Sequence, residues 1–223
     1  ILGVSQAHVS MMQEAYPFIA PEKFGYVYNG VNLERFSPAQ RPVREAHKLV
    51  WTSSPDRGLL HLLRMWPEII KHVPDATLHI FYGWGNIDKA IAAGDKRLAA
   101  LKAETMSLAI QPGLIWRGRV NQKQLALDLL SAQVWPYSCT WSEEFCINAL
   151  EAMAAGLFPV TSDLGALPEV MGDVGYRLPI RENFRPSQKK WRTAFTGIVL
   201  AGLLDEGERV KFREAGPARA AEF

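Results

Sequence analysis

The chain has 223 residues, of which 48% are hydrophobic, enough for a sizeable core and too many for a disordered protein. Its 25 Lys and Arg residues nearly balance 23 Asp and Glu residues, so the net charge of +2 gives no global attraction to nucleic acid or an anionic membrane. Two cysteines, Cys139 and Cys146, form neither a zinc pattern nor a disulfide framework, and no apolar run approaches the ~20 residues that cross a bilayer.

The first 47 residues lead into the main part of the chain, which begins at residue 48. Residues 1–5 fit the end of a strand and residues 6–16 a helix. Asn29-Gly30 is a turn signal, and residues 37–45, with two prolines, fit a polar loop. Because the chain begins at Ile1 without Met or a signal peptide, we expect it to be a fragment whose true start is missing.

From residue 48 onward, short apolar segments alternate with segments of helical periodicity. The predicted strands are 48–52, 77–82, 114–116, 134–137 and 158–162, and the predicted helices are 59–73, 87–110, 122–132, 144–155, 168–171 and 185–219. This alternation predicts an α/β fold, a Rossmann-like doubly wound parallel sheet covered on both faces. Ligands of such sheets bind at the carboxyl ends of the strands, so the loops there are the candidate site.

The loop after the first of these strands carries Ser53, Ser54 and Arg57. Two hydroxyls and a guanidinium at a helix N-terminus could hold a phosphate, although turn and capping chemistry explains the same residues. The loops 82–86, with two glycines, and 116–121, with two arginines, give weaker signals.

The strongest signal is the predicted helix 144–155, with Ser142 as its N-cap and Gly156 closing it. Glu143 would lie at its mouth, and Glu151 about 12 Å further along the axis. A carboxylate in a buried helix needs a partner, either a structural hydrogen bond or a ligand hydroxyl. Two such acceptors beside an electropositive helix N-terminus suit a ligand with hydroxyls at both ends and phosphates between.

Several of these segments occur in a recognisable order. They are Val4-Ser5, Asn29-Gly30-Val31 with Phe36, Arg57-Gly58, Gly118-x-Val120, the pattern Glu143-x7-Glu151 followed by Ala-Met-Ala-Ala-Gly-Leu-Phe-Pro-Val, and Gly165-x-x-Pro168-Glu169. Together they resemble the donor-binding, C-terminal half of GT-B glycosyltransferases of the large retaining family 4. The resemblance implies that residues 1–27 are a remnant of an N-terminal domain, 28–47 a linker and entry loop, and 48–223 the donor-binding domain.

The resemblance also implies residue roles around the sugar and the phosphates. Glu143 would contact hydroxyls of the donor sugar, and the backbone of Phe145, Cys146 and Ile147 would face the diphosphate. Arg57 stands where the family usually has a Lys that neutralises the diphosphate. Arg57 and Glu143 are therefore the expected catalytic residues.

The nucleoside end of the donor has its own implied contacts. Glu151 would bind the ribose hydroxyls, and the backbone of Arg119 and Val120 would lie against the base. Ser53 and Ser54 complete the expected donor-binding set.

Two positions depart from the family pattern. Thr52 replaces an Arg five residues before the phosphate-binding cation, and Ser53, Ser54 or Arg117 are candidates to substitute for it. Cys146 replaces the Gly that usually follows the Phe of the signature.

The implied activity is retaining transfer of a sugar from a nucleoside-diphosphate sugar, with UDP or GDP left open, to an acceptor hydroxyl in surface polysaccharide or glycoconjugate synthesis. It would need no metal and no cofactor besides the donor. The expected partners are a sugar or lipid-linked acceptor and the missing N-terminal domain, with no nucleic acid. The expected location is the cytoplasm or the inner face of the membrane. The alternatives are a GT-B nucleotide-sugar epimerase and a non-catalytic nucleotide-binding domain.

Overall fold

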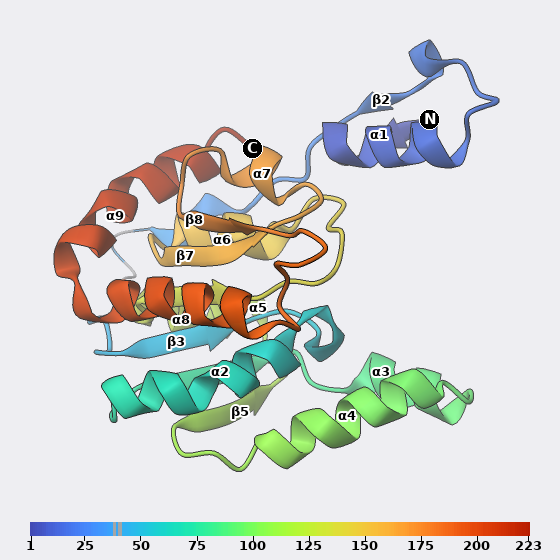
Figure 1. Cartoon of the computed structure of the whole chain (residues 1–223). Helices are drawn as coiled ribbons and strands as arrows, with labels where there is room; N and C mark the ends of the chain where they lie inside the picture. Colours follow the sequence, from blue (N-terminus) through green and yellow to red (C-terminus); the bar gives the residue numbers. More distant parts are fainter. Residues whose placement is uncertain (38, 40–41) are drawn as a thin grey trace.

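The computed structural model describes residues 1–37, 39 and 42–223, so Pro38, Gln40 and Arg41 of the predicted polar loop lie outside the described residues. The first 27 residues form a small unit at the upper right of Figure 1. In it, the strands β1 (Leu2–Gly3) and β2 (Gly25–Tyr26) pair with each other in parallel. Helix α1 (Gln6–Ala15) lies between them in the sequence. The sequence predicted β1 and α1 but not β2.

The remainder of the chain is built on one six-stranded sheet. Its strands are β3 (Lys48–Trp51), β4 (Thr77–Phe81), β5 (Leu114–Gly118), β6 (Val134–Tyr137), β7 (Phe158–Asp163) and β8 (Tyr176–Pro179). Every neighbouring pair is parallel, in the order β5-β4-β3-β6-β7-β8. The predicted doubly wound fold is therefore correct. The chain reverses its direction of winding between β3 and β6, the position where such sheets bind ligands.

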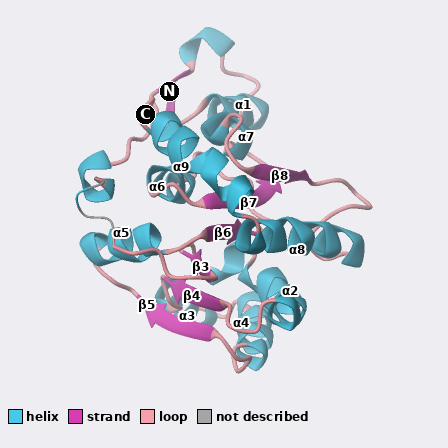
Figure 2. Cartoon of the chain, turned by 90° about the vertical axis from the view of Figure 1, so that its left-hand side faces the viewer, coloured by secondary structure: helices cyan, strands magenta, loops and turns pink. Residues whose placement is uncertain are grey.

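Helices cover both faces of the sheet (Figure 2). Helices α2 (Leu59–His72) and α8 (Lys189–Leu204) lie on one face, and α5 (Gln122–Ser131) and α6 (Ile147–Ala154) lie on the other. The other helices are α3 (Gly85–Ala92), α4 (Lys96–Leu108), α7 (Leu167–Met171) and α9 (Glu206–Ala220).

Three helix predictions need correction. The segment 87–110 is two helices, because Gly94 has a positive φ of 99° and Asp95 caps α4. The segment 185–219 is likewise divided, at Asp205, which ends α8 and caps α9. The helix predicted from Glu144 begins only at Ile147.

The core lies between the sheet and its two helical layers. Helix α2 contributes an apolar stripe, with Leu59, Leu62 and Trp66 fully buried. The strands read as continuous apolar runs, since both faces of a parallel sheet are covered. Trp51 of β3 and Trp135 of β6 are buried on neighbouring strands.

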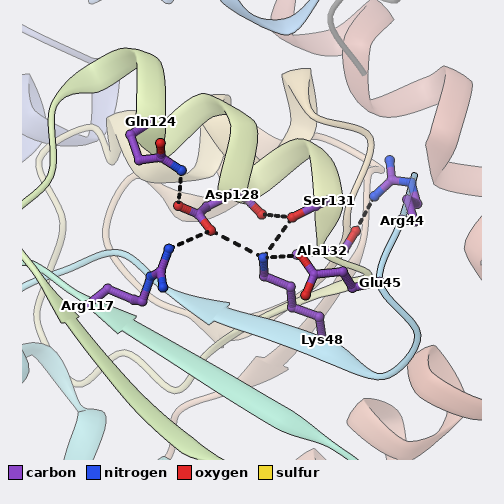
Figure 3. Close-up of polar contacts among 8 residues, drawn as sticks. All are labelled: Arg44, Glu45, Lys48, Arg117, Gln124, Asp128, Ser131 and Ala132. Carbon is purple, nitrogen blue, oxygen red and sulfur yellow. Dashed lines mark hydrogen bonds and ion pairs between the residues drawn. The ribbon is translucent and has the colours of Figure 1, made fainter. Parts of the chain in front are cut away.

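A cluster of charges lies at the opposite end of the sheet from the candidate site. Lys48, the first residue of β3, is only 2% exposed, and its Nζ contacts Glu45 at 2.7 Å, Ser131 at 2.7 Å and Asp128 at 3.2 Å (Figure 3). Arg117 approaches the same Asp128 carboxylate at 3.7 Å. The cluster ties the segment entering the sheet to α5.

The structure also bears on membrane crossing. Within the described ranges 1–37, 39 and 42–223, no helix combines the length and the apolar character that a membrane span requires.

Candidate functional site

Two adjoining cavities open at the carboxyl ends of the strands, on either side of the N-terminus of α6. Cavity I has a volume of about 420 Å³ and lies between the loops that follow β3 and β6. Cavity II, of about 280 Å³, lies beside the loop that follows β5. Tyr82, Ile147 and Asn148 line both, so the two cavities share a wall.

All ten residues of the predicted site line one of these cavities. Cavity I is lined by Ser53, Ser54, Arg57, Glu143, Phe145, Cys146 and Ile147, and cavity II by Arg119, Val120, Ile147 and Glu151. The sequence thus predicted residues that the fold brings together. Their roles toward a ligand remain predictions.

Arg57 ends a short 3-10 helix, Pro55–Arg57, in the loop after β3. Its guanidinium carbon lies 3.9 Å from the ring centroid of Trp141, and its buried Nη1 has no hydrogen-bond partner among the described residues. The next residue, Gly58, has a φ of 133°, and a Cβ there would collide with the carbonyl oxygen of Ser138. Glycine therefore allows the loops after β3 and β6 to touch and leaves a guanidinium group with unused donors in cavity I.

Glu143 lies in a loop and not at the mouth of a helix, which corrects the sequence prediction. Ser142 does not cap α6, and its hydroxyl instead lies 3.5 Å from the sulfur of Met11. The residue before α6 is Cys146, which adopts the left-handed conformation (φ 76°, ψ 73°) and makes no side-chain cap. The expected spacing along one helix axis therefore does not apply to Glu143 and Glu151.

The position of Glu143 is nevertheless fixed by several contacts. Its Oε1 accepts a hydrogen bond of 2.5 Å from the hydroxyl of Tyr137, and its carbonyl oxygen accepts one of 2.8 Å from the Ala166 N–H. A Cβ on Gly165 would lie 2.5 Å from the Glu143 backbone, so only glycine permits this approach.

Glu151 lies on α6 and is 7% exposed. Burial raises the pKa of its carboxyl, and the charge of Arg35 partly opposes that rise. Among the described residues, none donates a hydrogen bond to this carboxylate. It lines cavity II as a buried acceptor that a ligand donor could satisfy.

The candidates to substitute for the missing arginine lie in different places. Arg117 contacts Asp128 in the Lys48 cluster and lines neither cavity, whereas Ser53 and Ser54 line cavity I. Among the described residues lining cavity I, Arg57 is the only cation, and it faces an α6 N-terminus that no side chain caps.

Sequence reasoning assigned no site role to several lining residues, among them Tyr82, Asn148 and Trp141. Tyr82 has a φ of 86° and follows β4 directly, and the Tyr82-Gly83 step was the available signal. Asn148 donates a hydrogen bond of 3.3 Å to the carbonyl of Thr52 and is, besides Glu151, the polar residue of helix α6. Trp141, 47% exposed, gave no signal in the sequence.

In the part of the chain that the structure describes, no three His, Cys, Asp or Glu side chains gather so that they could hold a metal ion.

Comparison with known proteins identifies the family of this chain. Residues 47–184, more than half of the chain, match the sequence profile of the family described as glycosyl transferases group 1. The chain belongs to this family. A phosphatidyl-myo-inositol mannosyltransferase from Mycobacterium tuberculosis is 29% identical over 160 residues, which cover 68% of this chain and 39% of that protein.

Solved structures with a GT-B-like fold are similar to this chain. The Anabaena protein Alr3699/HepE, solved with UDP and glucose, has a TM-score of 0.74 at 16% identity, over 99% of this chain and 58% of that one. The pneumococcal O-GlcNAc transferase GtfA, solved with UDP and GlcNAc, has a TM-score of 0.69 at 16% identity, over 100% of this chain and 41% of that one. The group 1 domain described here thus spans about two fifths of the length of the curated relative that it matches.

Proposed function

We propose that this chain is the donor-binding half of a retaining glycosyltransferase that moves a sugar from a nucleoside-diphosphate sugar to an acceptor hydroxyl. The observation that carries the proposal is the pair of adjoining cavities: cavity I is lined by a cation, a carboxylate and an uncapped helix N-terminus, and cavity II by a second carboxylate. Glu143 in cavity I would accept hydrogen bonds from the sugar, and Glu151 in cavity II from the ribose.

The demands of the reaction match the charges of cavity I. As the bond from the sugar to the diphosphate breaks, negative charge grows on the leaving phosphate, and fixed donors aimed at that charge lower the barrier. Arg57 has a buried Nη1 with no partner in the described part of the chain, and the N-terminus of α6 lines the same cavity. We therefore propose that the diphosphate is neutralised by these groups without a metal ion.

The acceptor would be bound by a second domain. We propose that residues 1–27 belong to that domain and that the rest of it forms the opposite wall of the site. Holding donor and acceptor together can lower a barrier by about 7–11 kcal/mol, so donor binding without transfer is expected of this chain alone. A retaining role in polysaccharide or glycoconjugate synthesis, at the inner face of the membrane or in the cytoplasm, is part of the same proposal.

The test is a binding titration of the chain by calorimetry. UDP, GDP, UDP-glucose and GDP-mannose are each added in EDTA and, separately, with magnesium. We expect one nucleotide series to bind equally well in both buffers. Binding only with magnesium would contradict the role given to Arg57, and no binding in either buffer would contradict the donor site itself.

Two further assays on a longer protein that includes the second domain separate the alternatives. Transfer of radiolabelled sugar to an acceptor extract supports the glycosyltransferase. Release of a free epimer without an acceptor would instead support the epimerase, and donor binding with neither reaction would support the non-catalytic domain.

A further inference from the structure

The carboxylate of Glu143 is held by a residue to which the sequence assigned no role. Tyr137, the last residue of β6, is completely buried, and its hydroxyl donates to Glu143 Oε1 at 2.5 Å. Its ring is fixed between Trp51, at 5.1 Å between centroids, and Trp135, at 4.8 Å. The hydroxyl therefore has little freedom to move away from the carboxylate.

The hydroxyl of Ser53 extends this contact to the loop after β3. Its Oγ lies 3.2 Å from the Tyr137 oxygen. A carboxylate only accepts, so the single Tyr137 proton goes to Glu143 and the Ser53 hydroxyl must donate to Tyr137. The result is a directed chain, Ser53 to Tyr137 to Glu143, that crosses from the β3 loop to the β6 loop.

These hydrogen bonds give the two carboxylate oxygens of Glu143 different surroundings. Oε1 receives the Tyr137 hydrogen bond, and the Cys139 sulfur also approaches it, at 3.9 Å. No residue that the structure describes donates a hydrogen bond to Oε2, and Glu143 lines cavity I. Burial raises the pKa of Tyr137 well above its usual range, so its hydroxyl stays protonated and can donate to Glu143 Oε1.

We propose that Tyr137 is a positioning residue: it holds one carboxylate oxygen of Glu143 and leaves the other free to bind the donor sugar. Ser53, in the same proposal, supports Tyr137 through its hydrogen bond and does not bind the phosphates. The inference rests on the proposed donor-binding function. It also gives the two serines different roles. Ser54 lines cavity I but takes no part in the hydrogen bonds from Ser53 to Tyr137 to Glu143, so its hydroxyl is the one available to the diphosphate.

The experiment measures, on each variant, the affinity for a sugar nucleotide and for the matching free nucleotide. The probes are UDP-glucose with UDP, or GDP-mannose with GDP, according to which pair the unaltered chain binds. Tyr137→Phe keeps the ring and removes the hydroxyl. We expect it to weaken binding of the sugar nucleotide by about fivefold or more, the loss that corresponds to one ordinary hydrogen bond, and to leave binding of the free nucleotide unchanged.

A double-mutant cycle shows whether Tyr137 acts through Glu143. Because Glu143→Gln already removes the carboxylate, Y137F/E143Q should bind the sugar nucleotide as E143Q does. Tyr176→Phe is the matched control, since it removes a tyrosine hydrogen bond of 2.6 Å to Glu208 away from both cavities. It should change neither affinity.

Other results would overturn the proposal. Equal loss of both ligands in Y137F, no loss of either, or full additivity with E143Q would show that Tyr137 has no specific effect on Glu143. If Y137F does not fold, Ser53→Ala gives the same test, and equal loss of sugar nucleotide and free nucleotide there would assign Ser53 to the phosphates. If the unaltered chain binds none of the four probes, the proposed function fails first and this inference with it.

Discussion

The guanidinium of Arg57 lies against the ring of Trp141, at 3.9 Å from the centroid. The two residues come from loops that follow β3 and β6, the strands at which the sheet reverses its winding. The ring thus supports the cation from one side, where a stack of this kind contributes about 0.5–2 kcal/mol.

Arg57→Ala should weaken binding of a nucleoside diphosphate by about tenfold or more, because it removes charge-assisted hydrogen bonds to phosphate. Trp141→Ala should cause a smaller loss, of about two- to fivefold, since the cation remains but loses its support. Both affinities are measured by calorimetry. Arg213→Ala, which breaks an ion pair with Glu206 on α9, is the control and should bind like the unaltered chain. A loss with W141A as large as that with R57A would mean that the ring itself contacts the ligand.

Glu151→Ala should weaken binding of the nucleotide and leave inorganic diphosphate unaffected. The reason is that Glu151 lines cavity II and not cavity I, so only a ligand with a ribose reaches it. A hydrogen bond to a charged group contributes about 1.5–3 kcal/mol, which corresponds to a loss of about tenfold or more. Competition of each ligand against a fluorescent nucleotide measures both affinities, and parallel losses would instead make Glu151 a structural residue.

Glu151→Gln should raise the melting temperature at neutral pH in the absence of ligand. Burial raises the pKa of Glu151, so the folded state holds this proton more tightly than the unfolded state does. Stability from this group is therefore greatest below the unfolded pKa, falls as pH rises through the folded pKa, and stays lower above it. The gain should be a few degrees at pH 7, at about 2–4 °C per kcal/mol, and should disappear near pH 4. Melting curves across this range decide the matter, and a gain independent of pH would rule out titration as its cause.

Cys146 should tolerate glycine better than alanine, the reverse of the usual order in helices. Its φ of 76° is strained for any residue with a Cβ, at a cost of about 1–2 kcal/mol. Cys146→Gly loses a buried thiol but relieves that strain, whereas Cys146→Ala loses the thiol and keeps the strain. Denaturant unfolding should place C146G about 1 kcal/mol above C146A. A less stable C146G would mean that the backbone conformation is not strained.

Lys48→Met should destabilise the chain by about 3–5 kcal/mol, since it leaves the buried Asp128 carboxylate without its closest cation. Lys48→Met with Asp128→Leu should recover much of the loss, because the unpaired charge is then gone. Lys71→Met is the control: it breaks an exposed pair with Glu68, which contributes about 0–1 kcal/mol. All three are compared by urea unfolding, and a double variant no better than K48M would show that the cluster matters for its shape and not its charge.

Much of the sheet could be predicted from the sequence, because buried parallel strands read as short apolar runs between helical segments. The strand β8 escaped, since Tyr176 and Arg177 interrupt its apolar character at the sheet edge. The breaks at Gly94 and Asp205 carried the ordinary stop and capping signals and were hidden only by the helical periodicity on either side.

The residues that line the site could be predicted from the sequence, but much of their geometry could not. Glu143 and Glu151 were found because a motif joins them, but the loop that carries Glu143 depends on Cys146 adopting a conformation that usually belongs to glycine. The contacts of Tyr137 with Ser53 and of Trp141 with Arg57 depend on two loops meeting across the β3–β6 boundary. No local pattern records a contact between segments that are 80 or more residues apart.

The carboxylate of Glu169 accepts hydrogen bonds from the backbone N–H groups of Gln6, at 2.8 Å, and Ala7, at 2.9 Å. One side of this junction is a single side chain, and the other is main chain that every residue except proline supplies. Substitutions at positions 6 and 7, other than to proline, therefore leave these two hydrogen bonds in place, whereas a change at position 169 removes both at once. The attachment of the first turn of α1 to α7 thus depends on one acidic side chain, and its loss would free both N–H groups together.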